Sequence, residues 1–245
     1  MIPLKDKSKE VFTQNTTLHK VTHLHARFQF RLHPAKIEQL RGAVVAVMGR
    51  EYDLLHNHNP TKKDTSTAYI KRYPLIQYRS EQGKAAIYAW GAGVPVLKRF
   101  LLDHEFIQLG NYVQPLKIIH LREQEQAIEL APQMDYTYRI PCWIALNEKN
   151  YKRWRKNDAL VPRVQLLESI LRGQIVALLE GLGMTELPQI KVELIHLRGT
   201  RPVRAHGQPR IAFHILFRTN IILPNRIGLG RSVAFGYGAI NAISM

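Results

Sequence analysis

The sequence predicts an α+β protein made of two consecutive halves in which strands and helices follow a similar order. Several short segments alternate apolar with polar residues, which is typical of half-buried strands. Between them lie stretches with apolar residues at helical spacing. The chain has 245 residues, enough for two domains of about 100–125 residues each.

The first half is predicted to start with a strand at Val21–Leu32, where apolar and polar residues alternate. Pro34 suits the first turn of a helix, and the apolar spacing extends that helix to Gly49. A strand pair with a turn at Glu81–Gly83, a second helix and extended stretches follow: Pro74–Tyr78, Ala85–Trp90, Val94–His104, Phe106–Gln114 and Leu116–Leu121. The order β-α-β-β-α-β is ferredoxin-like.

The charged stretch Glu123–Gln133 has few apolar residues, and we place the domain boundary there, giving domains 1–125 and 126–245. An extended stretch, a basic segment, a long helix and two strands follow: Tyr136–Leu146, Asn150–Asn157, Val164–Leu182, Gln189–Leu197 and Ile211–Ile222. This is a less clear version of the first half. The predicted fold is therefore two tandem ferredoxin-like (RRM-like) domains.

The charge balance indicates a polyanionic partner. Lys and Arg number 35 against 19 Asp and Glu, a formal net charge of +16 spread along the chain. Nucleic acid is the favoured partner, and a basic protein with an acidic protein partner is the alternative. The sequence shows no long apolar run and no apolar leader, and its single cysteine, Cys142, cannot form an internal disulfide. We therefore expect a cytoplasmic protein that does not associate with membranes.

A glycine-rich segment close to the C-terminus is the sharpest motif. Two Gly-hydrophobic-Gly triplets, formed by Gly228, Gly230, Gly236 and Gly238, bracket five residues that begin with Arg231. Glycine permits positive φ and lets backbone N–H groups approach an anion, so the segment is a candidate phosphate contact. The alternative is a tight loop before a final strand. A dinucleotide-binding fingerprint does not fit, because only seven residues follow Gly238.

His56 and His58 are the candidate catalytic residues. They lie two residues apart in a polar stretch between a helix and a strand. Histidine titrates near neutral pH, so one can accept the 2′-OH proton of RNA while the other protonates the leaving 5′-oxygen. Lys62 and Lys63 follow the pair and can stabilise the charged phosphate. A surface loop with incidental histidines is the alternative.

Two basic stretches are candidate RNA contacts. Arg198, Arg201, Arg204 and Arg210 lie in a connection between two predicted strands, which suits the phosphates of a duplex stem. Lys152, Arg153 and Arg155 lie beside Tyr151 and Trp154, a mixture of cations and rings that suits unpaired bases. Each stretch is alternatively a solvated surface.

The complete glycine pattern resembles the C-terminal loop of the RAMP superfamily. The strand Phe213–Pro224 before it also resembles the stretch that precedes that loop, and the double ferredoxin-like layout is that superfamily's fold. The His56-Asn57-His58 segment, followed by Arg72–Tyr78 (RYPLIQY), resembles the subfamily that processes repeats in type I-B CRISPR systems.

This resemblance implies a metal-independent endoribonuclease that cuts CRISPR precursor RNA within its repeats, using His56 and His58. The products would carry a 5′-hydroxyl and a 2′,3′-cyclic phosphate, and no cofactor would be needed. It also implies that the protein retains the mature guide RNA and joins other subunits of a type I effector complex.

Two other functions remain open at this point. A RAMP subunit that binds guide RNA without cutting it shares the fold and the loop. A metal-dependent DNA nuclease would need ligands for its metal, and no cluster of Asp, Glu, Cys or His has suitable spacing. The sequence does not assign base and acid within the His pair or a role for Tyr69, and His23 and His25 are the next catalytic candidates.

Overall fold

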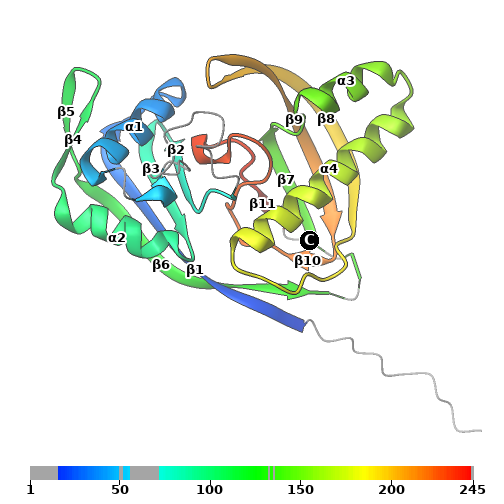
Figure 1. The fold of residues 1–245 in the computed structure, drawn as a ribbon, viewed down its shortest axis with the longest axis horizontal. Coiled ribbons are helices and arrows are strands. Elements are labelled where there is room, and N and C mark those ends of the chain that lie inside the picture. The colour runs from blue at the N-terminus through cyan, green and yellow to red at the C-terminus, as the bar shows by residue number, and fades with distance from the viewer. Residues whose placement is uncertain (1–15, 50–51, 56–71, 132, 135, 244–245) are drawn as a thin grey trace, which may run out of the picture.

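The computed structural model describes residues 16–49, 52–55, 72–131, 133–134 and 136–243 and contains two main sheets side by side, with the glycine-rich segment between them (Figure 1). We call the residues up to Leu130 the first half and those from Tyr136 onwards the second half. Within the described ranges, no helix combines the length and apolar character that a membrane span requires.

The first half has the predicted ferredoxin-like order. Its elements are β1 (Thr16–Arg31), α1 (Ile37–Met48), β2 (Ile76–Glu81), β3 (Lys84–Trp90), α2 (Gly93–Asp103) and β6 (Ile118–Leu130). The four strands pair antiparallel in the order β6-β1-β3-β2, and Pro34 opens a short 3-10 turn before α1, as expected. Apolar residues of β1 and β3 form one core with α1 and α2, because alternate positions of each strand face the helices.

Two details of the first half differ from the sequence prediction. The stretch Phe106–Gln114 is a small separate hairpin of β4 (Phe106–Leu109) and β5 (Tyr112–Pro115), with Gly110 at positive φ in its turn. Beyond the predicted stretch Leu116–Leu121, β6 (Ile118–Leu130) continues through the charged residues 123–130, in which the domain boundary was placed. Polar side chains are tolerated there because β6 lies near the edge of the sheet: the short β10 (Ile221–Ile222) pairs only with Glu129 and Leu130.

The second half repeats the strand order with a different helix content. Its elements are β7 (Tyr136–Trp143), α3 (Glu148–Lys156), α4 (Leu160–Gly181), β8 (Val192–Ala205), β9 (Gln208–Thr219) and β11 (Asn241–Ile243). The sheet order β11-β7-β9-β8 matches β6-β1-β3-β2, which confirms the second ferredoxin-like unit. Where the last helix of such a unit would stand, the chain forms the glycine-rich segment with a 3-10 turn at Val233–Phe235.

The two halves share a hydrophobic core. Leu171 and Ile175 of α4 belong to the same buried cluster as Tyr88 and Trp90, which lie on the face of the first sheet opposite α1 and α2. The face of the first sheet that ferredoxin-like RNA-binding domains use for base stacking is thus largely covered by the second half, and Trp90 is fully buried.

Candidate nucleic-acid interface

The predicted catalytic pair, His56 and His58, lies outside the described residues, as do Lys62, Lys63 and Tyr69. The residues on either side of this segment are well anchored. Leu55 is buried at the end of a 3-10 turn, and its carbonyl oxygen accepts a hydrogen bond of 2.9 Å from Nε of Arg41 on α1. On the other side, Arg72 forms an ion pair of 2.9 Å with Asp53.

The glycine-rich segment 228–238 is held by hydrogen bonds within the protein. The N–H of Leu229 donates to Gly238 O, that of Arg231 to Ile144 O and that of Gly238 to Cys142 O. Gly238 has φ +74°, and a Cβ there would overlap the carbonyl oxygen of Leu229. These three N–H groups are therefore already paired within the protein, and at Gly238 the absence of a side chain permits close packing. The RNA-binding role expected of the glycines stays a prediction.

The glycine-rich segment also contacts the first half. Tyr73 Oη donates to Gly228 O at 2.7 Å, and Gln77 Nε2 donates to Tyr73 Oη at 2.9 Å. Phe235 packs into the core beneath α1, and Gly236 allows the chain to pass close to the carbonyl oxygen of Tyr78. The segment therefore connects the two halves.

Arg231 lies beside the basic helix α3, although the two are far apart in the sequence. An open groove of about 630 Å³ is lined by Arg231 and by cationic residues of α3, namely Lys149, Lys152, Arg153 and Lys156. Burial, followed by the charge of the nearby Arg210, lowers the pKa of Arg231. The groove brings together three of the predicted RNA-binding residues: Arg231, Lys152 and Arg153.

The ring of Trp154 on α3, which was expected to stack on unpaired bases, is partly buried by packing within the protein. Its ring packs edge-on against Phe213 at 5.1 Å between centroids, and the Arg163 guanidinium lies over it at 5.1 Å. Tyr151, on the same helix, remains 37% exposed. Arg155 is also exposed but does not line the groove.

The basic stretch 198–210 is the outer part of one β-hairpin. β8 continues to Ala205 and β9 starts at Gln208, with the turn at His206 and Gly207, both at positive φ. Arg198, Arg201 and Arg204 lie on β8 and are exposed, whereas Arg210 on β9 is half-buried. The turn contacts α1 of the first half and the glycine-rich segment: His206 N donates to Glu38 at 2.8 Å, and the His206 ring meets Phe235 edge-on at 4.5 Å.

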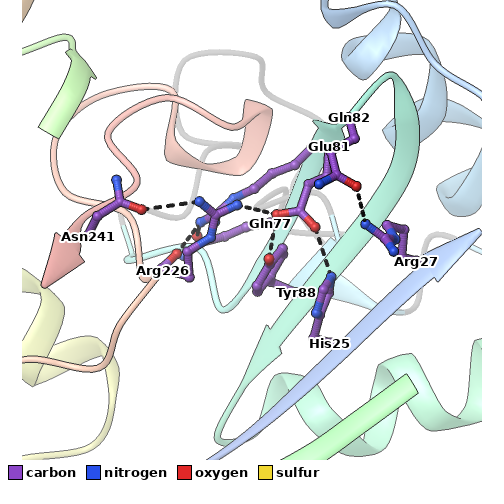
Figure 2. A network of polar contacts seen from close by, with 9 residues as sticks. His25, Arg27, Gln77, Glu81, Gln82, Tyr88, Arg226 and Asn241 are labelled. Carbon is purple, nitrogen blue, oxygen red and sulfur yellow. Dashed lines mark hydrogen bonds and ion pairs between the residues drawn. The ribbon is translucent and has the colours of Figure 1, made fainter. Parts of the chain in front are cut away.

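A polar network between the halves was missed from the sequence. Glu81, at the end of β2, receives hydrogen bonds from Tyr88 (2.5 Å) and Arg226 and lies 3.1 Å from His25 (Figure 2). Together these bonds lower the pKa of the carboxyl of Glu81, although its burial acts in the opposite direction. Arg79, which is 4% exposed, donates to Gln77 and to the carbonyl oxygen of Arg226. The sequence signal for this network was the presence of polar residues in β2, a strand that is mostly buried.

His23 and His25 lie on the same covered face as this network. His23 stacks on Trp90 at 4.0 Å between centroids, and burial followed by the neighbouring His25 lowers its pKa to about 3. His23 is therefore neutral near pH 7 and too weak a base for proton abstraction. Across the described ranges, no group of three His, Cys, Asp or Glu side chains lies close enough together to hold a metal ion.

Comparison with known proteins gives consistent matches over most of the chain. The models of the Cas6b N-terminal and C-terminal domains match residues 17–127 and 131–243. An uncharacterized protein of Methanocaldococcus jannaschii is 36% identical over 101 residues, which cover 41% of this chain and 67% of that protein.

Solved structures match the whole fold. A crystal structure of Cas6b superposes with a TM-score of 0.79 at 23% identity, covering 92% of this chain and 100% of the other. A second, described as the CRISPR RNA processing endoribonuclease Cas6b, superposes with a TM-score of 0.68 at 21% identity and the same coverage. The type IV crRNA endonuclease Csf5 has a TM-score of 0.54 at 13% identity, again with 92% and 100% coverage. At these identities the superpositions show a shared fold.

Proposed function

The chain belongs to the Cas6b family, and on that premise we propose that it is an endoribonuclease that cuts CRISPR precursor RNA within its repeats. The observation that carries this proposal is a path of neighbouring residues, most of them cationic, that ends at the anchor of the His56 segment. The path contains residues of α3, of the glycine-rich segment, of the β8–β9 hairpin and of α1.

Each step of this path rests on a contact or on an electrostatic interaction between neighbouring side chains. Arg231 shares a groove with Lys152 and Arg153, and it is close enough to Arg210 for the two charges to interact. Arg210 and Arg231 in turn interact with His206, whose ring packs against Phe235.

The remaining step leads from Phe235 to the His56 segment. The guanidinium of Arg41 lies over the Phe235 ring at 5.0 Å, and Arg41 holds the carbonyl of Leu55, the residue before His56. An RNA backbone bound along this path would therefore pass the start of the segment that carries both histidines.

We propose that His56 and His58 transfer the two protons of the reaction. One removes the proton of a 2′-hydroxyl, whose oxygen attacks the adjacent phosphorus, and the other protonates the departing 5′-oxygen. The products are a 2′,3′-cyclic phosphate and a 5′-hydroxyl. Because the nucleophile belongs to the substrate and histidines move both protons, the reaction needs no metal. After cleavage the cationic path retains the guide RNA, ready for assembly with other type I effector subunits.

A cleavage assay with a labelled repeat transcript tests this function. We expect wild-type protein to cut at one position in each repeat in the presence of EDTA, and His56→Ala with His58→Ala to abolish cutting while binding persists. His104→Ala, at the end of α2, is the matched control and should cut normally. A protein that binds the repeat and never cuts it would instead be a guide-RNA-binding subunit. Cleavage of DNA that stops in EDTA would indicate a metal-dependent nuclease.

A further inference from the structure

The two residues that follow the His56 segment, residues 56–71, are held in different ways. Arg72 forms its 2.9 Å ion pair with Asp53, but the two side chains are 27% and 40% exposed, so water screens their attraction. Tyr73 instead packs against the hydrophobic core that the two halves share. Tyr73 is therefore the first residue after the segment that joins this core.

The hydroxyl group of Tyr73 has one defined orientation. A guanidinium only donates hydrogen bonds, so Arg79 fixes the side-chain oxygen of the fully buried Gln77 as its acceptor, at 2.8 Å. The amide nitrogen of Gln77 then faces Tyr73 and donates to its hydroxyl oxygen at 2.9 Å. The hydroxyl hydrogen is left for the carbonyl oxygen of Gly228, which lies 2.7 Å away on the glycine-rich segment.

The hydroxyl of Tyr73 stays protonated in the pH range in which histidines exchange protons. Burial raises the pKa of Tyr73 above its ordinary value of 10.0, opposed by the hydrogen bond from Gln77. Near neutral pH the hydroxyl therefore donates to the carbonyl oxygen of Gly228 at all times. It can hold the chain in place, but it cannot act as a base.

The helix α4 meets Tyr73 from another side. Gly181 is the last residue of α4, and a Cβ at this position would lie 2.4 Å from the Cβ of Tyr73. Carbon atoms in favourable contact are about 3.5–4.0 Å apart, so a side chain at position 181 would push Tyr73 away from the helix. The absence of a side chain at Gly181 therefore allows Tyr73 to lie directly against α4.

Tyr73 is thus fixed to the second half by both the glycine-rich segment and α4. Two residues of extended chain span about 7 Å, so the position of Tyr73 limits where residue 71, the downstream end of the His56 segment, can lie. The upstream end is held by the first half, where Arg41 on α1 binds the carbonyl oxygen of Leu55. The two ends of the segment therefore depend on different parts of the protein.

We propose that Tyr73 is a positioning residue, which fixes the downstream end of the His56 segment to the second half and thereby places the two histidines against the bound RNA. This role rests on the proposed function, in which His56 and His58 transfer the protons. A displacement of about 1 Å at a reacting group can cost about 10²-fold in rate. Loss of the anchor should therefore slow cleavage and leave the affinity for RNA unchanged.

Tyr73→Phe removes the hydroxyl group and keeps the ring. We expect single-turnover cleavage of the repeat transcript at saturating enzyme to slow by about 10- to 100-fold. The Kd for a repeat with a 2′-deoxy nucleotide before the scissile phosphate should stay near that of wild type. The dependence of the rate on pH should keep its wild-type shape, because the same histidines still move the protons.

Tyr138→Phe is the matched control within the second half. The hydroxyl of Tyr138 is also buried and accepts a hydrogen bond of 2.8 Å from the N–H of Leu223, so this variant loses a comparable interaction. It should lower the urea midpoint about as much as Tyr73→Phe does, and it should cut at the wild-type rate. If Tyr138→Phe slows cleavage as much as Tyr73→Phe, a general loosening of the fold explains both, and the positioning role is wrong.

Gly181→Ala displaces Tyr73 without changing the tyrosine and should also slow cleavage at unchanged affinity. Gly42→Ala, on the exposed surface of α1, is its control, because nothing lies within 4 Å of the added Cβ. If Tyr73→Phe does not fold, Gly181→Ala decides.

Wild-type cleavage rates in both folded variants would overturn the positioning role, and so would lost affinity with a normal rate at saturation. These outcomes leave the proposed function intact. A wild-type protein that binds the repeat and never cuts it would instead refute the proposed function, together with the role of Tyr73 that rests on it.

Discussion

Replacing Gly238 with alanine should destabilise the fold, whereas replacing Gly83 should cost much less. Both glycines have φ +74°, so both alanines suffer the same backbone strain of about 1–2 kcal/mol. At Gly83, in the β2–β3 turn, nothing lies within 4 Å of the added Cβ. At Gly238 the Cβ overlaps Leu229 O. Moving the chain apart breaks the hydrogen bonds from Leu229 N to Gly238 O (2.9 Å) and from Gly238 N to Cys142 O (2.8 Å).

Each lost backbone hydrogen bond costs about 0.5–1.5 kcal/mol, so Gly238→Ala should lose about 2–5 kcal/mol in total and Gly83→Ala only the strain. Equilibrium unfolding in urea measures the difference. Tryptophan fluorescence suits this measurement because Trp90 and Trp143 are fully buried, one in each half.

The comparison separates a packing role of the glycine from a phosphate-binding role. If Gly238→Ala and Gly83→Ala reduce the free energy of unfolding by amounts that agree within about 0.5 kcal/mol, the neighbours of Gly238 move aside easily and the packing argument is wrong. A Gly238→Ala protein of normal stability that has lost its affinity for RNA would instead support close approach of the backbone to phosphate.

Three further predictions concern the reaction, the cationic path and acid stability. His56→Ala and His58→Ala should each slow single-turnover cleavage by about 10²–10⁴-fold, and a 2′-deoxy nucleotide before the scissile phosphate should block cutting but not binding. Arg231→Ala should weaken RNA binding and reduce by about 0.7–0.9 the slope of the logarithm of the binding constant against the logarithm of salt concentration. Its cleavage rate at saturating enzyme should stay near that of wild type. Unchanged affinity for RNA with a collapsed cleavage rate would make Arg231 catalytic. Folding lowers the pKa of His23 from 6.5 to about 3, so the unfolded chain takes up the proton at a higher pH than the folded protein does. Stability is therefore lost as the pH falls below 6.5, and the loss at pH 5 is on the order of 2 kcal/mol. With His23→Phe, the free energy of unfolding measured in urea should change less between pH 7 and pH 5 than in wild type. A variant of the exposed His196 serves as the control and should keep the wild-type pH dependence. If His23→Phe also keeps the wild-type pH dependence, the assignment to His23 is wrong.

The strand and helix pattern of the first half was predictable because it depends on local periodicity. Alternation over Val21–Leu32 identifies β1, and the spacing from Pro34 to Gly49 identifies α1, although its predicted first turn is a 3-10 turn. The extension of β6 through residue 130 was not predictable in this way, because an exposed strand near a sheet edge carries the same polar residues as a linker.

The candidate site was predictable only as separate segments. The sequence identified the glycine-rich segment, the basic stretches and the His56–His58 pair, whose own positions lie outside the described residues. It did not show that Arg231 lies beside α3, or that Trp154 packs inward on Phe213. Side-chain direction on a short helix depends on the surface that the helix covers, and that surface belongs to other parts of the chain.

By itself the sequence determined the number and order of the two strand-helix units, the strong positive charge and the glycine pattern, since all of these are properties of residues near one another in the chain. Tertiary structure alone decided that the second half covers Tyr88 and Trp90 and that Arg226 reaches Glu81 across 145 positions. The physical reason is that burial and ion pairing depend on how two sheets pack against each other, and periodicity within one element carries no information about that packing.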